Sequence, residues 1–358
     1  MQLQQLSFTG VRNLVQVDME CADRINLIFG CNAAGKTSIL EGIHLLSRAS
    51  SFRTPSIKEI IQHGRDHLSV HASIKLDSNS AIQTGMETTR THTRIQYAGK
   101  RVKKRSEQAK NLPIIAITPE SNQLLNGPPR LRRHWLDWSM FHVEPDYMGV
   151  WHTYHHALRH RNTLLRKRAP ASQFSAWDQI LSKSGYQLRT MRGQYLARLV
   201  QEYNAENPQH VVEAGLRTQD ESQEGLYRQL VEGQESDRHR GHTQTGAHRE
   251  DVLFMHSQGE ANKIFSRGEG KRFLLQLLLA QACLYQKMVH VRPIILIDDL
   301  GAELDKENLI LAMRYLQAQE AQVFITMVDP SVVLSCQPVA GLFHVEQGVL
   351  RNVIKYPL

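Results

Sequence analysis

The chain has 358 residues, 41% of them hydrophobic, and a formal net charge of +8 at pH 7. This length favours two domains or one domain with a large insertion, and the apolar content favours a folded core over disorder. No apolar run is long enough to cross a bilayer, no signal-peptide pattern is visible, and the four cysteines have no paired spacing. We therefore expect a cytoplasmic protein with free thiols and no membrane partner, and the basic charge favours nucleic acid as a partner.

Strands predominate among the predicted elements of the first third. Apolar residues alternate with polar ones, or form short apolar runs, in the segments 15–19, 68–76, 95–97 and 112–118. Residues 98–100 are typical of a hairpin turn. Residues 25–29 predict a short buried strand, and residues 38–46 predict a helix with apolar residues at helical spacing.

The segment between that strand and that helix reads G-x-x-x-x-G-K-T, the pattern of a phosphate-binding loop. The glycines allow backbone N–H groups to wrap phosphates, and the following helix N-terminus favours an anion. Lys36 is expected to reach the outer phosphates, and the Thr37 hydroxyl to ligate Mg²⁺. The sequence therefore predicts binding of ATP or GTP at Gly30, Cys31, Asn32, Ala33, Ala34, Gly35, Lys36 and Thr37.

The middle of the chain, from about residue 128 to residue 232, is rich in helix formers. Residues 170–172 interrupt it, which predicts a helical hairpin or small bundle, and residues 233–246 predict a linker because they are rich in charge, His and Gly. Three basic clusters suit DNA phosphates without sequence preference. They are Lys100, Arg101, Lys103, Lys104 and Arg105; Arg130, Arg132 and Arg133; and Arg159, Arg161, Arg166, Lys167 and Arg168.

The last third predicts a parallel sheet. A long apolar helix over 272–285 precedes an apolar strand over 292–297, which is followed by a helix over 306–318 and a strand over 322–326. Strand, helix and strand in this order are typical of parallel pairing.

Two carboxylates, Asp298 and Asp299, end the first of these strands. Asp298 is expected to hold Mg²⁺, directly or through water, and Asp299 to orient or deprotonate the attacking water. Roughly 260 residues separate Lys36 from Asp298, so the sheet must be assembled from both ends of the chain around a helical block.

A Ser-x-Gly turn, formed by Ser266, Arg267 and Gly268, begins the long apolar helix. Its hydroxyl, backbone N–H groups and helix dipole suit a γ-phosphate. Ser is also among the favoured residues at an ordinary helix N-cap, so both interpretations stay open from the residues alone.

Nine short motifs follow one another along the chain: RNL at 12–14, SFRT at 51–54, TPE at 118–120, GPP at 127–129, RR at 132–133, LD at 136–137, GAHRED at 246–251, SRG at 266–268 and GAELD at 301–305. In this order they resemble the bacterial RecF family of SMC-like ABC ATPases. The resemblance implies an α/β fold, with a P-loop ATPase head assembled from residues 1–127 and 246–358 and an inserted helical arm at 128–245.

The resemblance also implies an ATP-dependent homodimer. In that dimer Ser266, Arg267 and Gly268 of one subunit cap the γ-phosphate bound by the other, and Asp305 belongs to the D-loop. Arg12 and Ser38 are then expected to join the ATP site. From the basic clusters we expect DNA contacts at Lys103, Lys104, Arg105, Arg132 and Arg133.

RecF-like proteins act in recombinational repair and replication restart, so the resemblance implies action at gapped or junction DNA, with RecR, RecO and RecA. Two alternatives are a chromosome-structural SMC-like ATPase and the nucleotide-binding subunit of an ABC transporter. The first would need a longer heptad coiled coil than about a hundred residues can supply. The second would need a membrane partner.

Four departures from the ABC pattern bear on the rate of hydrolysis. Glu269 stands where Gln is usual, Asp299 stands where many have Glu, and no His precedes Pro330 in the switch region, where Thr326 is the nearest polar residue. No certain Q-loop glutamine is present, although Gln123 is close. We therefore predict weak, DNA-stimulated ATP hydrolysis, with ATP acting as a dimerisation switch.

Overall fold

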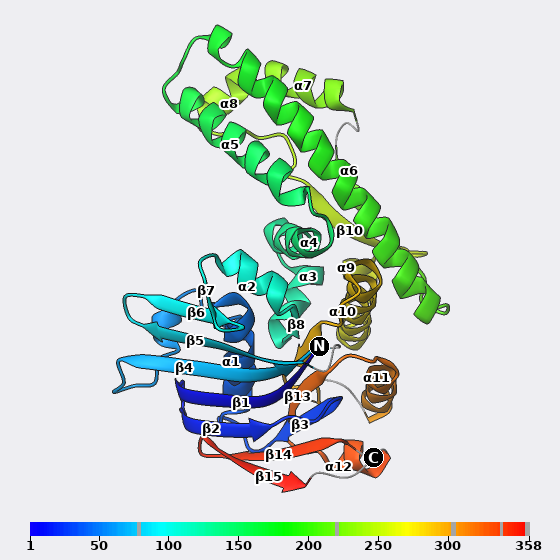
Figure 1. The fold of residues 1–358 in the computed structure, drawn as a ribbon. Coiled ribbons are helices and arrows are strands. Elements are labelled where there is room, and N and C mark those ends of the chain that lie inside the picture. Colours follow the sequence, from blue (N-terminus) through cyan, green and yellow to red (C-terminus); the bar gives the residue numbers. More distant parts are fainter. Residues whose placement is uncertain (77–79, 219–221, 302–305, 337–338, 355–358) are drawn as a thin grey trace. The chain divides into compact units, whose positions relative to one another are not determined.

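The structure, a computed structural model, describes residues 1–76, 80–218, 222–301, 306–336 and 339–354. The chain divides into two compact units (Figure 1). The head unit comprises Met1–Ser121 and Tyr285–Leu358, and the arm unit comprises Asn122–Leu284. Residues 246–284 thus group with the arm unit, whereas the functional division at 127/128 and 245/246 stays a prediction.

The head unit contains a mostly parallel sheet in the order β15-β14-β3-β13-β12-β8. Its strands are β3 (Ile25–Phe29), β8 (Ile114–Ile117), β12 (Ile294–Ile297), β13 (Val323–Met327), β14 (Gly341–Glu346) and β15 (Val349–Ile354). β12 is apolar and buried along its whole length, and β13 is also buried throughout, with Thr326 as its one polar residue, as expected for strands covered on both faces. β3 pairs with β13 and β14, so the prediction of a sheet assembled from both chain ends is confirmed.

A second, antiparallel sheet of the head unit has the order β2-β1-β4-β5-β6-β7. Its strands are β1 (Gln2–Val11), β2 (Leu14–Glu20), β4 (His67–Lys75), β5 (Ala81–Thr89), β6 (Thr93–Tyr97) and β7 (Lys100–Val102). β4 alternates buried and less buried residues, which is the period that predicted it. Ala98 and Gly99 both have positive φ, of 49° and 76°, and form the predicted hairpin turn between β6 and β7.

The first helix, α1 (Lys36–Arg48), joins these two sheets into one core. It contacts β1, β4 and β5 of the antiparallel sheet and β8 and β13 of the parallel sheet. Most of its residues are buried, including the polar Ser38, Glu41 and His44, because apolar layers cover it on two sides. The other described helices of the head unit are the short 3₁₀ turns Ile57–Glu59 and Pro119–Asn122, of which the second ends at the boundary with the arm unit, and α2 (Arg105–Asn111), α11 (Lys306–Ala318) and α12 (Ser331–Cys336).

The arm unit is mainly helical. Its helices are α3 (Gln123–Asn126), α4 (Pro129–Val143), α5 (Tyr147–Arg166), α6 (Ser175–Glu206), α7 (Gln223–Glu232), α8 (Gln234–Arg240), α9 (Ala261–Ile264) and most of α10 (Arg267–Val289). A small sheet of β9 (Val212–Arg217), β10 (Asp251–His256) and β11 (Gly259–Glu260) completes it. α5 and α6 pack together on either side of Pro170, so the predicted break at 170–172 is confirmed.

The predicted linker over residues 233–246 is wrong, because α8 lies within it. Asp237 of α8 is buried and accepts a hydrogen bond from the Nη1 of Arg161 at 2.5 Å. The Nε of Arg161 also donates to Asp178 at 2.7 Å, and Arg161 itself has no exposed surface. A charge-rich composition suggested a solvated segment, but these buried ion pairs order it.

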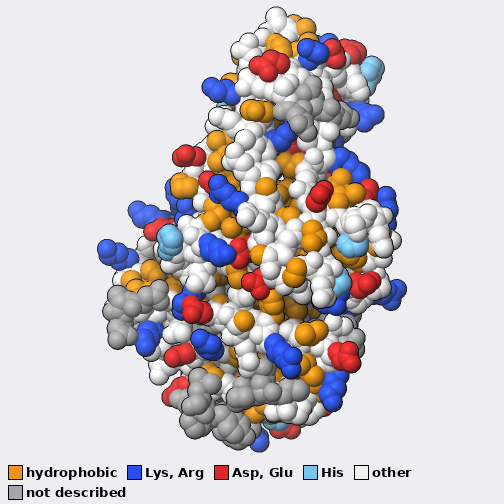
Figure 2. Space-filling model, turned by 90° about the vertical axis from the view of Figure 1, so that its right-hand side faces the viewer, with side chains coloured by type: hydrophobic (Ala, Val, Ile, Leu, Met, Phe, Trp, Pro, Cys, Tyr) orange, Lys and Arg blue, Asp and Glu red, His pale blue; other side chains and the backbone are white. Residues whose placement is uncertain are grey.

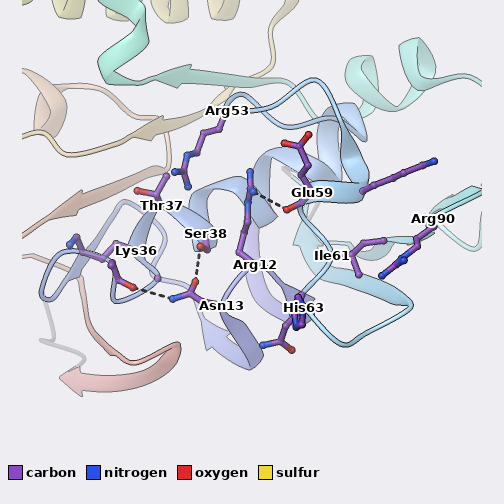
Figure 3. A pocket seen from close by; sticks show the side chains of 14 residues that line it. Arg12, Asn13, Lys36, Thr37, Ser38, Arg53, Glu59, Ile61, His63 and Arg90 are labelled. Atoms are coloured by element: carbon purple, nitrogen blue, oxygen red, sulfur yellow. Dashed lines mark hydrogen bonds between the residues drawn. The ribbon is translucent and has the colours of Figure 1, made fainter.

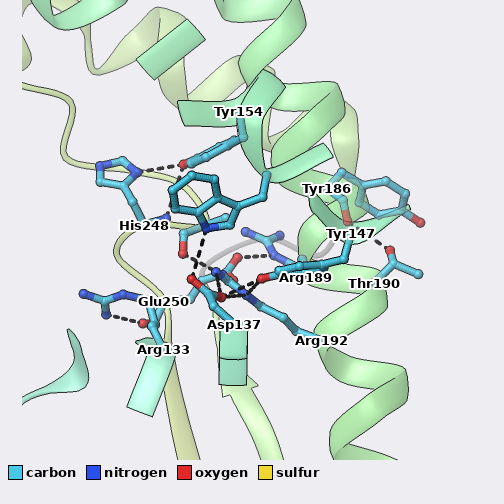
Figure 4. Close-up of polar contacts among 12 residues, drawn as sticks. Arg133, Asp137, Tyr147, Tyr154, Tyr186, Arg189, Thr190, Arg192, His248 and Glu250 are labelled. Carbon is cyan, nitrogen blue, oxygen red and sulfur yellow. Dashed lines mark hydrogen bonds and ion pairs between the residues drawn. The ribbon is translucent and has the colours of Figure 1, made fainter. Parts of the chain in front are cut away.

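A second buried polar network lies where α4, α5 and α6 meet the segment before β10 (Figure 4). The Nη2 of Arg192 donates to Asp137 at 2.6 Å, and the Tyr147 hydroxyl donates to the same carboxylate at 2.5 Å. Arg189 donates to Glu250 at 2.6 Å. Every charge of this network has an opposite partner, which is the condition for burying charges at tolerable cost.

Within the described ranges, every helix is too short or too polar to span a lipid bilayer.

Candidate nucleotide-binding site

The loop of residues 30–35 connects β3 to α1 and is held by the C-terminal part of the chain. A Cβ on Gly30, whose φ is 151°, would lie 2.2 Å from the carbonyl oxygen of Val345, so only glycine fits there. The backbone N–H of Gly348 donates to the carbonyl of Ala34 at 2.8 Å. The loop is exposed at Cys31, Asn32 and Ala33, and buried at Ala34 and Gly35.

Lys36 bends back over the loop. Its Nζ donates to the carbonyls of Gly30 and Cys31, at 2.8 Å each. The aliphatic stem is buried, so the ammonium is held at the loop by a covered side chain. This places one fixed positive charge at the N-terminus of α1, where the helix dipole also favours an anion.

Thr37 and Asp298 lie together although 261 positions separate them in the sequence. The Oγ1 of Thr37 lies 2.9 Å from Oδ1 and 3.1 Å from Oδ2 of Asp298. Burial raises the pKa of Asp298, while hydrogen bonds from Thr326 and Thr37 and the charge of Arg53 lower it in part. The expected pairing of the loop with the acidic strand end is therefore present in the fold.

Asp299 follows with a left-handed backbone, at a φ of 57°. Its N–H donates to Oγ1 of Thr326 at 2.8 Å, and that hydroxyl in turn donates to Oδ1 of Asp298 at 2.7 Å. Thr326, on β13, thus contacts both members of the carboxylate pair.

A cavity of about 1150 Å³ opens beside the loop (Figure 3). In this view Lys36 and Thr37 lie to the left and Arg90 to the right. The cavity is lined by Arg12, Asn13, Ala33, Gly35, Lys36, Thr37, Ser38, Arg53, Lys58, Glu59, Ile61, Gln62, His63 and Arg90. Cations outnumber the single lining carboxylate, so the cavity suits a polyanion.

Glu41 is a buried charged residue beside the cavity that the sequence analysis did not single out. Its carboxylate is fully buried on α1 and accepts two hydrogen bonds from Arg12, at 2.9 and 2.8 Å. Ser51 also donates to it, and Arg53 lies 4.0 Å away. The hydrogen bond to Glu41 raises the pKa of Arg12. The sequence contained one signal for this residue, namely an acidic side chain on the face of the helix that is buried.

Arg12 lines the cavity, but its guanidinium is mostly engaged. Besides Glu41, it donates to the carbonyl of Glu59 at 2.8 Å. Asn13 is placed by two contacts: it accepts from Ser38 at 2.9 Å and donates to the carbonyl of Ala33 at 3.2 Å. The 12–13 turn and the 51–59 segment are thereby fixed against α1.

The Ser266 segment belongs to the arm unit. Ser266 and Glu269 form a capping box at the start of α10, in which the Ser266 N–H donates to Glu269 at 2.8 Å and the Glu269 N–H to Ser266 Oγ at 3.3 Å. Those hydrogen bonds lower the pKa of Glu269. Residues 266–269 are exposed, including the predicted Arg267 and Gly268. Asp305 lies outside the described residues, and Gln123 begins α3 of the arm unit.

The predicted DNA-binding residues fall into two structural groups. Lys103 and Lys104 are exposed between β7 and α2, and the exposed Arg105 begins α2. Arg132 is buried, paired with Asp251 at 2.7 Å, and also donates to three backbone carbonyls, so it is not available to a DNA phosphate.

Arg133 is half-buried and donates to the Glu250 carbonyl at 2.6 Å. On the face drawn in Figure 2, Lys and Arg side chains are scattered among Asp and Glu.

Known proteins match the chain over nearly its whole length. The model of the RecF/RecN/SMC N terminal domain matches residues 2–351. The DNA replication and repair protein RecF of Thioalkalivibrio sulfidiphilus is 35% identical over 359 residues, covering 98% of this chain and 99% of that protein. RecF of Pseudomonas aeruginosa is 36% identical, with 97% of each covered.

Solved structures share the fold. The structure of the recombination mediator protein RecF with ATP matches with a TM-score of 0.87 at 22% identity, over 99% of this chain and 98% of that one. An Smc head bound to the C-winged helix domain of ScpA matches with a TM-score of 0.59 at 13% identity, over 99% and 97%. The predicted SMC-like head fold is thus confirmed, and the chain belongs to the RecF family of DNA replication and repair proteins.

Proposed function

We propose that the chain binds ATP with Mg²⁺ in the head cavity and uses it as a switch in recombinational DNA repair. The observation that carries the proposal is the meeting of Thr37 with Asp298 at 2.9 Å, beside the loop that holds Lys36. A phosphate-binding loop and an acidic strand end are the two halves of a P-loop nucleotide site. ATP as the nucleotide is supported by the fold shared with a RecF whose solved structure is described as RecF-ATP.

The Mg²⁺ part of the proposal rests on the donor set. Oγ1 of Thr37 and the nearer Asp298 oxygen lie 2.9 Å apart, and both are hard oxygen donors of the kind that Mg²⁺ prefers. Mg²⁺ at such sites uses one or two protein groups and takes its remaining ligands from phosphates and water. When bound, the ion would neutralise charge on the phosphates. Asp299 would orient the attacking water, and Lys36 would hold the outer phosphates.

The outer half of the cavity is the place for the nucleoside. Ile61, Gln62 and His63 offer an apolar side chain, an amide and a ring there, which suit a base and its polar edge. Arg12 also lines the cavity and would attract ATP, with its positive charge partly offset by Glu41.

ATP-driven dimerisation is the second part of the proposal. The exposed residues Ser266, Arg267 and Gly268 begin a long helix, so a second subunit can bring their N–H groups to a bound triphosphate. Asp305 would belong to the same interface. ATP then favours the dimer because the dimer binds it with more contacts than the monomer does.

The biological part of the proposal places this switch at gapped or junction DNA, where the protein acts with RecR and RecO and helps to load RecA. Support comes from the relatives named for DNA replication and repair and from a solved relative described as a mediator of the RecFOR pathway. Weak, DNA-stimulated hydrolysis would reset the switch.

One experiment tests the switch. We expect ATP to raise both the dimer fraction in analytical ultracentrifugation and the affinity for gapped duplex DNA in fluorescence anisotropy. ADP should do neither, and Lys36→Met should abolish the ATP effect. Equal DNA affinity and equal mass with ATP, ADP and no nucleotide would contradict the proposal.

The DNA contacts are tested separately. Replacing Lys103, Lys104 and Arg105 by Gln should weaken DNA binding at all sequences and reduce the slope of log affinity against log salt by up to about 3. The matched control replaces Lys183, an exposed lysine of α6 outside these clusters, by Gln. An unchanged salt slope in the triple variant would remove this cluster from the DNA site.

A further inference from the structure

Thr326 occupies a position from which one side chain contacts the carboxylate of Asp298 and the backbone N–H of Asp299. It lies near the end of β13, next to β12, and is fully buried. Its hydroxyl accepts from the Asp299 N–H at 2.8 Å and lies 2.7 Å from Oδ1 of Asp298.

The direction of these two bonds is fixed by chemistry. The Asp299 N–H can only donate, so the Thr326 oxygen is its acceptor, and the single hydroxyl proton is left for Asp298. The carbonyl of Thr326 also accepts from the Leu300 N–H at 3.1 Å. Thr326 therefore holds three consecutive residues that follow β12.

These hydrogen bonds hold Asp299 in an unfavourable backbone conformation. Asp299 has a φ of 57°, a left-handed backbone that a non-glycine residue adopts at a cost. The hydrogen bond from the Asp299 N–H to Thr326 offsets that cost and fixes the backbone position from which the Asp299 side chain extends. The bond to Oδ1 fixes the rotation of the Asp298 carboxylate, which also faces Thr37.

We infer that Thr326 is a positioning residue that orients Asp298 toward Mg²⁺ and Asp299 toward the attacking water, in a switch region whose sequence lacks the usual His. The inference rests on the proposed ATP site. A hydroxyl is required at this position because the side chain must accept one hydrogen bond and donate another at the same time. The methyl group of Thr326 takes part in neither bond.

The test compares Thr326→Val, which keeps the shape and removes both bonds, with Thr326→Ser, which keeps the hydroxyl. ATP binding is measured by anisotropy of a fluorescent ATP analogue, in EDTA and across a Mg²⁺ titration, together with kcat and KM for hydrolysis. For Thr326→Val we expect affinity in EDTA within about twofold of the wild type, and a gain from Mg²⁺ and a kcat that are each about tenfold smaller. Thr326→Ser should restore both to within about twofold.

The matched control is Thr84→Val. Thr84 is also a buried strand threonine of the head unit, with its hydroxyl donating to the Gln96 carbonyl at 2.9 Å. It should leave the Mg²⁺ response at the wild-type value. If Thr326→Val does not fold, Thr326→Ala takes its place in the same titration.

Three outcomes would overturn the inference: a wild-type Mg²⁺ response in the Val or Ala variant, a loss in the Ser variant as large as in Val, or an equal loss in Thr84→Val. A wild-type protein that binds no ATP in either buffer would instead refute the proposed function, so the two failures are distinguishable.

Discussion

The buried arginines of the arm unit and the exposed arginines of the head cavity have opposite roles. In the arm unit, Arg161 and Arg192 are buried, and each is saturated by carboxylates of the chain itself. In the head cavity, Arg53 and Arg90 are exposed, Arg53 only approaches the carboxylate of Glu41 at 4.0 Å, and the lining contains a single acidic residue. The difference teaches that a cation is free for a ligand only where the fold does not supply its counter-charge.

The largest expected effect comes from breaking the internal charges of the arm. Arg161→Met leaves Asp178 and Asp237 buried without their cation, so we expect a loss of about 3–5 kcal/mol in the free energy of unfolding of the arm unit. Urea unfolding followed by tryptophan fluorescence measures it, because the four tryptophans, Trp135, Trp138, Trp151 and Trp177, all lie in that unit.

Arg159, an exposed arginine of the same helix, provides the control for this change. Arg159→Met should change the unfolding free energy by less than about 0.5 kcal/mol. Affinity for ATP should stay at the wild-type value in both variants, since the cavity is built from head residues. Equal stabilities of the two variants would contradict the contrast between the units.

The next effect comes from the head. Lys36→Met should weaken ATP binding about 100-fold, roughly 2.7 kcal/mol, because it removes charge-assisted bonds to the phosphates. The tryptophan-detected unfolding of the arm should not change. Isothermal titration with ATP measures the affinity, and Lys183→Met is the control; a loss below about threefold in Lys36→Met would argue against this lysine as the phosphate ligand.

Acidification should destabilise the arm unit through a buried histidine. Burial lowers the pKa of His248 to about 4, whereas an unfolded imidazole titrates near pH 6.5. Between these values the unfolded state binds more protons, so the stability conferred by neutral His248 is present above pH 6.5 and is lost as pH falls toward 4. The slope approaches about 1.4 kcal/mol per pH unit.

Comparison with His248→Gln isolates this contribution, since the variant should show a shallower pH dependence of tryptophan-detected unfolding over the same range. His44 in the head unit, with a pKa lowered to about 3 by burial, acts in the same direction but is not followed by tryptophan. Parallel pH profiles for wild type and variant would show that His248 is not the group responsible.

The smallest effect concerns the capping box. Glu269→Gln keeps an acceptor for the Ser266 N–H and removes a negative charge from the face expected to meet a partner's triphosphate. We expect the ATP-dependent dimer to become about threefold tighter in analytical ultracentrifugation. Glu224→Gln, in the first turn of α7, is the matched control; a weaker dimer in Glu269→Gln would reverse the inferred role of the charge.

Much of the nucleotide site was predictable because its signals are local. The loop of residues 30–37 lies between the predicted strand and helix, and the acidic end of β12 follows an apolar run. The 262-position offset between Lys36 and Asp298 also predicted a sheet assembled from both ends, which the pairing of β3 with β13 and β14 confirms.

Other features could not be predicted because they depend on partners far apart in the chain. Arg132 resembled a DNA contact until Asp251, 119 positions away, was seen to neutralise it. The segment 233–246 resembled a linker until Arg161 was found to hold α8. Composition records that a residue is charged, but burial and counter-charge are properties of the folded chain.

By itself, the sequence determined the phosphate-binding loop, the carboxylate pair and the two-ended head, since these follow from short patterns and their spacing. Only the tertiary structure decided that Thr326 holds both Asp298 and Asp299, that Glu41 holds Arg12, and which arginines are left for a ligand. The physical reason is that a hydrogen bond or an ion pair is set by distances of about 3 Å between atoms that the sequence alone does not bring together.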